Sequence, residues 1–470
     1  DSTSIVVGSM IGSGIFIVSA DMARQLGSPG WLLIAWILTG FMTLFAALSY
    51  GELAAMFPKA GGQYVYLREA YNPLVGFLYG WTMFLVIQTG TIAAVAVAFG
   101  KFAGVLFPWF SEKNILIDFV FLKINSLQLI AIISLIVLTL INLTGIRIGK
   151  IVQNFFTFSK TLALFGLIIL GFFFFNHSFA IEANSKIFWE ALSLSNGSAV
   201  PLGGGALLAA VCMAMVGSLF SSDAWNNITF TAGEVINPKR NIPVSLFLGT
   251  LIVTLIYILV NIIYLNILPL RGIESGSNDI ERGIMYATND RVGTAAMSLV
   301  IGNYAAIIMA VFIMVSTFGC NNGLILAGAR IYYAMAKDNL FFKKAGELNS
   351  GKVPGTALTA QCIWTAVLCL TGTYSDLLDY VVFSVLIFYV LTIAGIFVLR
   401  KTKPNTERPY KAFGYPYVPV IYIIFAFIIM TVLLLYKPKF TWPGLFIVLL
   451  GIPVYYIRNR INIKKSNVSN

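Results

Sequence analysis

Charged residues are scarce in this sequence, and their scarcity indicates its broad class. Asp, Glu, Lys and Arg make up 11% of the 470 residues, whereas a soluble domain carries about 25%. Hydrophobic residues make up 58% of the chain. Such a composition leaves no room for a sizeable soluble domain and predicts an all-α polytopic membrane protein.

Cysteine and histidine are nearly absent, which excludes several kinds of site. The four cysteines lie within apolar runs, an arrangement that argues against a disulfide framework or a thiolate metal site. The single histidine, His177, lies at the end of such a run. We therefore expect no metal and no cofactor. We also predict that the protein is not an enzyme, because catalysis would need clustered His, Cys, Asp or Glu side chains.

Long apolar runs dominate the chain. A membrane-spanning helix takes about 20 residues. Twelve candidate runs fall at about 4–25, 31–57, 73–104, 126–146, 151–175, 203–235, 241–268, 293–335, 356–374, 377–400, 416–436 and 440–458. We therefore expect about twelve transmembrane helices. Because the first run begins almost at Asp1, we also expect a short segment to precede it.

The basic residues indicate an orientation. If the N-terminus is cytoplasmic, the inner loops and the C-terminal tail hold Lys59, Arg68, Arg147, Lys150, Lys239, Arg240, Arg330, Lys337, Lys343, Lys344, Lys352, Arg400, Lys401, Lys403, Arg408, Lys411, Arg458, Arg460, Lys464 and Lys465. Basic loops stay on the cytoplasmic side. We therefore predict a multi-pass protein of the inner (plasma) membrane with both termini in the cytoplasm. The net charge of +12 then indicates contact with membrane lipid, not nucleic acid.

A cluster of small residues interrupts the first apolar run. Three glycines and two serines fall within residues 8–14, and each glycine weakens a helix by about 1 kcal/mol relative to alanine. An opened turn at membrane depth is tolerated only where protein buries it or where it lines a cavity. We expect the amides of Ser13, Gly14 and Ile15 to bind a carboxylate there. Close helix packing through the small residues is the alternative.

A second glycine-rich run has the same character. It extends from Gly203 to Trp225, and Gly217 follows Gly8 at nearly the spacing that separates the spans beginning near 31 and 241. Because five spans separate the two copies, the second is inverted in the membrane. The carbonyls of residues 220–222 then suit an ammonium group. An anion site facing a cation site predicts a zwitterion, such as an amino acid, as the ligand.

Several motifs together resemble one family. They are the Gly-Ser-Gly break at 12–14, GEL at 51–53, PKAGGQY at 58–64, AWN at 224–226, GE at 233–234 and NPKRNIP at 237–243. The combination is similar to the amino acid–polyamine–organocation superfamily, and especially to bacterial relatives of the L-type amino acid transporters.

The resemblance has consequences for the fold and for partners. It implies a five-plus-five inverted repeat over residues 1–176 and 203–400, followed by two further helices over 415–460. It also implies alternating access and amino acid exchange. Animal relatives pair with a glycoprotein through an outer cysteine between spans three and four. Residues 105–125 contain no cysteine, so we expect no disulfide-linked heavy chain.

Lys160 is a charge about ten residues into the fifth span, roughly 14 Å deep at 1.5 Å per residue. A charge at that depth costs at least ~2.5 kcal/mol and is a functional hypothesis by default. The resemblance places it where sodium-coupled relatives of the fold bind a cation, near the hydroxyls of Ser316 and Thr317. Its ammonium could replace that ion or titrate. Alternatively it is satisfied by nearby carbonyls, or it snorkels.

The expected site residues divide by role. The residues expected to bind the substrate are Ile11, Gly12, Ser13, Gly14, Ile15, Phe220, Ser221, Ser222 and Asp223. Phe220 resembles the family's aromatic lid, and Trp225 resembles the support of that lid. Ordinary packing of these two aromatic side chains is the alternative. Asp223 either stabilises the second break by bonding Trp225 or backbone amides, or faces the substrate side chain and favours cationic amino acids.

The expected function is secondary transport of amino acids, with exchange of neutral L-amino acids as the first hypothesis. A proton- or sodium-coupled symporter of amino acids or polyamines on the same fold is the alternative, with cationic substrates if Asp223 faces them. A channel is disfavoured, because it would carry repeated pore motifs and not one inverted pair within a chain.

Overall fold

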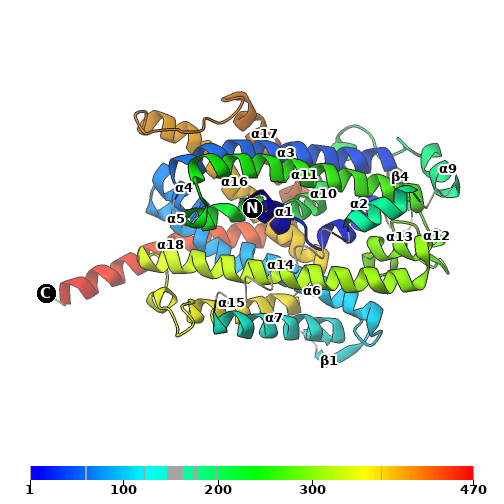
Figure 1. Ribbon diagram of the computed structural model, residues 1–470, viewed down its shortest axis with the longest axis horizontal. Helices are drawn as coiled ribbons and strands as arrows, with labels where there is room; N and C mark the ends of the chain where they lie inside the picture. Colours follow the sequence, from blue (N-terminus) through cyan, green and yellow to red (C-terminus); the bar gives the residue numbers. More distant parts are fainter. Residues whose placement is uncertain are drawn as a thin grey trace.

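The structure is a computed structural model that describes residues 2–58, 61–119, 122–145, 162, 164–173, 178–195, 198–371 and 373–468. Long helices run side by side along its longest axis (Figure 1). Within these residues, nine helices are long and apolar enough to cross a membrane, and two shorter apolar helices occupy Leu164–Phe173 and Gly355–Leu370. The predicted all-α membrane fold is confirmed.

The described helices are α1 (Ser2–Met10), α2 (Val18–Leu26), α3 (Pro29–Met56), α4 (Gln63–Ala70), α5 (Pro73–Thr82), α6 (Gln88–Leu106), α7 (Ser126–Thr144), α9 (Ser178–Lys186), α10 (Gly204–Ser221), α11 (Pro238–Ile267), α12 (Asp279–Arg282), α13 (Val292–Ile301), α14 (Asn303–Lys337), α15 (Gly355–Thr371), α16 (Tyr374–Thr402), α17 (Tyr417–Tyr436) and α18 (Pro438–Val468). Short 3-10 segments are η1 (Gly14–Phe16), η3 (Trp225–Glu234), η4 (Thr288–Asp290) and η5 (Lys343–Gly346), and η2 (Met83–Ile87) is a π-helical turn.

Two antiparallel hairpins complete the described elements. Strand β1 (Ile115–Phe119) pairs with β2 (Leu122–Asn125), with Asp118 opposite Lys123. Strand β3 (Leu192–Ser195) pairs with β4 (Ser198–Pro201). Both hairpins lie at one end of the bundle, on the right in Figure 1, which we call the hairpin end. The opposite end, which carries α4, is the α4 end.

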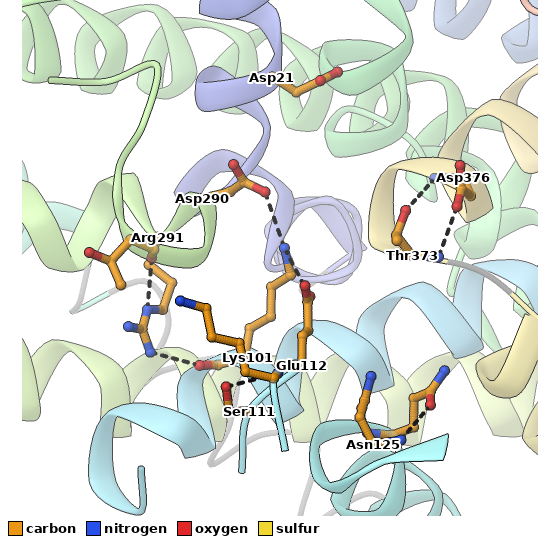
Figure 2. Close-up of polar contacts among 12 residues, drawn as sticks. Asp21, Lys101, Ser111, Glu112, Asn125, Asp290, Arg291, Thr373 and Asp376 are labelled. Carbon is orange, nitrogen blue, oxygen red and sulfur yellow. Dashed lines mark hydrogen bonds and ion pairs between the residues drawn. The ribbon is translucent and has the colours of Figure 1, made fainter. Parts of the chain in front are cut away.

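Local signals set several helix starts. Ser28 accepts a hydrogen bond from the amide of Trp31, and Pro29 follows it in the first turn of α3. Asn125 and Gln128 form a capping box at α7, and Thr373 and Asp376 form another at α16 (Figure 2). These side chains pair amides that a helix start would otherwise leave unsatisfied.

The two interrupted segments lie in the middle of the bundle. Helix α1 packs on α11, and α2 packs on α10. Helices α3, α6, α14 and α16 surround them in Figure 1. The last two helices are peripheral, since only 33% of the span in α17 and 22% of that in α18 is buried by protein. They therefore leave most of their apolar surface for lipid.

One predicted span is divided. The run predicted at 293–335 forms α13 and α14, which are separated at Gly302 with φ of 89°. A residue with a β-carbon rarely adopts this φ, so glycine permits the break. The repeat boundaries at 1–176, 203–400 and 415–460 stay a prediction.

Candidate functional site

The first break opens the backbone between α1 and α2. The last regular hydrogen bond of α1 runs from the amide of Ile11 to the carbonyl of Val7, at 3.0 Å. Within the described residues, no backbone carbonyl pairs with the amides of Ser13, Gly14 or Ile15. These amides precede α2, at the positive end of its dipole, so they can receive an anion.

The second break follows α10. The amide of Asp223 donates to the carbonyl of Phe220 at 3.2 Å, and Ala224 has φ of 63°. A non-glycine residue in this left-handed region costs about 1–2 kcal/mol. The chain leaves the helix here, at the negative end of the α10 dipole. Because a carbonyl oxygen has two lone pairs, those of Ser221 and Ser222 can each accept a further donor.

Tyr257 on α11 connects the two breaks. Its hydroxyl lies 3.0 Å from the carbonyl oxygen of Met10 and 3.1 Å from that of Ser221. The ring of Trp36 packs against it edge-on at 5.4 Å between centroids. Tyr257 is not among the residues predicted from the sequence, because it lies in a plain apolar run without a motif. Two tyrosines seven residues apart in this run, Tyr257 and Tyr264, are the only signal that could have indicated it.

The two breaks also touch directly. A β-carbon added at Gly14 would overlap the Ser221 hydroxyl and lie 2.8 Å from the Ser221 β-carbon. One added at Gly12 would meet the Cys320 sulfur at 3.6 Å, an ordinary contact. The backbone at Gly14 therefore approaches the end of α10 as closely as only a glycine allows.

A cavity lies beside both breaks. Of the predicted substrate-binding residues, its lining contains Gly12, Ser13, Gly14, Phe220, Ser221 and Asp223. Ile11 and Ile15 are fully buried and do not line it. Ser222 and the predicted lid support Trp225 line a second cavity instead. The structure thus brings together most, but not all, of the predicted set.

The hydroxyl of Ser13 is the most available polar group on the first break. Its residue is 1% exposed, and among the described side chains its oxygen has no regular hydrogen bond, although the Tyr374 hydroxyl approaches it. Leaving a buried hydroxyl unpaired costs about 1–3 kcal/mol. A carboxylate bound by the neighbouring amides would provide the missing acceptor.

Asp223 has a partner that the sequence did not indicate. The hydroxyl of Tyr389 on α16 donates to its carboxylate at 2.5 Å. The backbone amide of Ala224 is a second hydrogen-bond partner. Asp223 therefore bonds a backbone amide of the second break, as the structural alternative predicted, but it does not bond Trp225. Trp225 instead packs on the rings of Tyr50 at 4.8 Å and Tyr389 at 5.4 Å.

The predicted lid residue Phe220 is 8% exposed and packs edge-on against Tyr374, with 6.1 Å between ring centroids. The ammonium of Lys101 lies 5.8 Å from the centre of the Tyr374 ring. Tyr374 therefore lies close both to Phe220 and to the charged residues of the hairpin end.

Further polar side chains line the cavity. Gln63, which belongs to the PKAGGQY motif and lies at the start of α4, donates to Thr392 at 3.0 Å and accepts from Asn226 at 3.3 Å. Gln88 follows the π-helical turn of the third span and donates to the carbonyl of Leu324 at 2.7 Å. π-helical turns are frequent at functional sites, but the sequence gives no sign of this one.

Of the predicted coupling residues, Lys160 lies outside the described residues. Ser316 is fully buried, and its hydroxyl has no hydrogen-bond partner among the described residues. Thr317 donates within its own helix, to the carbonyl of Ile313 at 3.0 Å or of Met314 at 2.9 Å.

An ion-pair cluster holds the hairpin end together. Figure 2 shows the Lys101 ammonium of α6 between the carboxylates of Asp290, at 3.2 Å, and Glu112, at 3.8 Å. Arg24 of α2 also reaches Asp290, at 2.7 Å. Burial alone would raise the pKa of Asp290, but the charges of Lys101 and Arg24 lower it below its usual value. Asp290 therefore connects α2 to α6 as a carboxylate.

Replacing Asp290 with Asn should destabilise the protein at neutral pH by about 1.5–3 kcal/mol, because Lys101 is buried and loses its nearest counter-charge. A lowered folded-state pKa gives stability that is present above about pH 4 and lost as the pH falls further. The difference in stability between the wild type and the variant should therefore become smaller at acidic pH. Thermal denaturation of purified protein from about pH 7 down to about pH 2, below the lowered pKa, measures it. A deficit that does not depend on pH would contradict the assignment.

Across the described part of the chain, no three His, Cys, Asp or Glu side chains gather closely enough to hold an ion. The cavity offers amides, carbonyls and hydroxyls beside one carboxylate, which are groups that bind an organic ligand.

Comparisons with known proteins indicate the family of this chain. A family profile described as amino acid permease matches residues 1–455. The chain is 31% identical over 456 residues to the large neutral amino acids transporter small subunit 2 of Homo sapiens, covering 96% of this chain and 78% of that protein. It is 29% identical over 456 residues to the serine/threonine exchanger SteT of Bacillus subtilis (strain 168), covering 96% and 94%. The profile covers nearly the whole chain, which therefore belongs to the amino acid permease family, as its motifs predicted.

Proposed function

We propose that this protein exchanges neutral L-amino acids across a membrane by alternating access. The observation that carries the proposal is the pair of facing breaks beside one cavity. The first break presents unpaired amides to the cavity, and the second break presents carbonyls with spare lone pairs. A zwitterion is the ligand that satisfies both walls at once.

Each end of the substrate has a matching group. The carboxylate binds the amides of Ser13, Gly14 and Ile15 at the start of α2 and accepts from the Ser13 hydroxyl. The ammonium donates to the carbonyls at the end of α10. The dipoles of the two helices favour this orientation, since α2 presents its positive end and α10 its negative end. Backbone groups contact only the ammonium and the carboxylate, which all amino acids share. The side chain of the substrate is therefore selected by the other residues that line the cavity.

Neutral substrates fit the partners of Asp223. Its carboxylate already accepts the Tyr389 hydroxyl, so a cationic side chain would have to displace that donor. The names of two relatives, a large neutral amino acids transporter subunit and a serine/threonine exchanger, also favour neutral substrates. Because Asp223 lines the cavity, cationic substrates remain the second candidate.

Lys160 and the basic loops bear on coupling and orientation. Lys160 stands in for a bound cation near Ser316, whose buried hydroxyl has no partner among the described residues. A fixed positive charge there would make exchange independent of sodium and pH gradients. The α4 end, where basic residues gather, faces the cytoplasm of a plasma-membrane protein. Lipid surrounds the bundle, and no disulfide-linked partner is proposed.

Counterflow in proteoliposomes tests the proposal. Liposomes loaded with unlabelled amino acid should accumulate the labelled amino acid without a pH or sodium gradient, whereas empty liposomes should not. Serine, alanine, leucine, phenylalanine and arginine form the panel. Uptake that strictly requires a gradient would identify a symporter. Counterflow of arginine alone would make Asp223 a receptor for cationic side chains. Absence of counterflow for every amino acid would refute the transport proposal.

A further inference from the structure

A patch of positive charge lies at the α4 end, where α14 leads into η5. Lys337, Lys343 and Lys344 are exposed there, and none of the three forms an ion pair among the residues that the structure describes. The one acidic residue between them in the sequence, Asp338, already pairs with Arg68 of α4. The three ammonium groups are therefore available to an anion.

The end of α18 adds further positive charge to this patch. The guanidinium of Arg458 donates to the carbonyl of Phe341, two residues before η5, and its other N–H groups can still bind an acceptor. Arg460 is exposed two residues further on, where α18 continues past the α4 end (Figure 1). These two arginines and the three lysines outnumber the exposed carboxylate of Glu347, which follows η5. The patch therefore attracts anions.

Apolar side chains beside the patch indicate how it meets the membrane. The apolar span in α18 ends at Arg458, so the basic end of this helix lies where the hydrocarbon layer meets the lipid headgroups. Phe342, directly before the two lysines of η5, is 72% exposed. Four further exposed apolar residues on α18 precede Arg458: Phe446, Leu449, Tyr456 and Ile457. A ligand that combines a negative charge with a long apolar chain matches both surfaces.

A stack of aromatic rings connects the patch to the cavity beside the two breaks. Phe342 contacts Phe341 at 5.2 Å between ring centroids. Phe341 in turn stacks on Tyr332 at 5.4 Å and packs against Phe84 at 5.6 Å. The Tyr332 hydroxyl donates to the carbonyl of Met83 at 3.3 Å. Phe84 and Met83 belong to the π-helical turn η2, and Met83 lines the cavity. A ligand that fixes Phe342 therefore also supports this part of the cavity wall.

We propose that an anionic phospholipid binds at this patch and supports the cavity wall through the aromatic stack. Its phosphate accepts hydrogen bonds from the three lysines and from Arg458. Its acyl chains lie along the exposed apolar side chains of α18, and Phe342 lies between the headgroup and these chains. A soluble anion would satisfy the charges but would leave Phe342 in water. The proposal goes beyond the proposed function, and its binding step does not depend on transport.

Lipid titration followed by thermal denaturation tests the binding site. Phosphatidylglycerol added to the protein in detergent should raise the midpoint of denaturation by about 2 °C or more, because a ligand stabilises the folded state that binds it. The double variant Lys343→Gln/Lys344→Gln should need about 10–30-fold more lipid for the same shift, since each basic residue near an anionic lipid contributes about a factor of five. Both lysines are exposed, so the substitutions should not unfold the protein.

Lys401→Gln/Lys411→Gln is the matched control, because it removes the same charge from exposed positions at the same end of the bundle. It should respond to phosphatidylglycerol as wild type does. An equal loss in both double variants would reduce the effect to nonspecific electrostatics and overturn the site. An equal shift with phosphatidylcholine of the same acyl chains, or with inorganic phosphate alone, would also overturn it.

Counterflow tests whether the bound lipid supports the cavity wall. For the amino acids that the panel identifies as substrates, wild-type exchange should be at least about twofold faster in liposomes with phosphatidylglycerol than in phosphatidylcholine alone. Phe342→Ala should abolish this difference, whereas the control variant should keep it. A wild-type rate that does not depend on phosphatidylglycerol would overturn the coupling through the aromatic stack. Absence of exchange in either lipid would refute the proposed function, whereas the binding measurement needs no transport, so the two failures are distinguishable.

Discussion

Gly14→Ala should lower amino acid exchange by about 10–100-fold, the largest functional effect that we expect from one methyl group. The new β-carbon would overlap the Ser221 hydroxyl and lie 2.8 Å from the Ser221 β-carbon. Either α2 or the end of α10 must then move. Because the amides on one side and the carbonyls on the other must bind one small ligand together, their separation reduces affinity at both ends.

Gly205→Ala is the matched control for this variant. It adds the same methyl group near the start of α10, away from the cavity, where no other heavy atom lies within 4 Å of the new β-carbon. Binding affinity and counterflow should stay close to wild type. Thermal denaturation of both variants separates loss of binding from loss of folding. Equal activity of the two alanine variants would contradict the close approach of the breaks.

Glu52→Gln should cause the largest loss of stability, about 3–5 kcal/mol. Glu52 is 1% exposed, and its carboxylate accepts from Arg400 at 2.6 Å and 3.0 Å and from the amide of Ala412 at 2.7 Å. Arg408 approaches it at 3.4 Å. A neutral amide leaves two arginines without their common counter-charge, in a place that water reaches poorly. The midpoint of thermal denaturation should fall accordingly.

Glu407→Gln provides the comparison for Glu52. Its partner Lys239 lies at 2.8 Å, but the two side chains are 74% and 49% exposed. Exposed ion pairs contribute about 0–1 kcal/mol, so this variant should denature within a degree or two of wild type. If both variants shifted the midpoint equally, burial would not be the reason for the importance of Glu52.

The fold was largely predictable because membrane insertion depends on simple quantities. Length and hydropathy define a span, and the described residues contain nine long apolar helices where the runs predicted them. The two breaks were predictable because clustered glycines weaken a helix at a depth where lipid otherwise favours an unbroken one. The first occurs within the predicted residues 8–16, and the second ends α10 at Ser221.

Side-chain pairings across the bundle were not predictable. Tyr389 is separated by 166 positions from its partner Asp223, and Tyr257 by 247 positions from Met10. Such contacts depend on the rotation and height of each helix, which apolar periodicity alone does not specify in lipid. Ser222, which was predicted to bind the substrate, and Trp225, which was predicted to support the lid, both line the second cavity.

The interrupted first segment has a consequence for biogenesis. Helix α2 contains nine residues, which is about half a bilayer crossing. It therefore cannot complete insertion as an independent unit during synthesis. Its packing partner α10 is made much later. We therefore expect this half-helix to stay in a shallow position until the middle of the chain has been made and can pack against it.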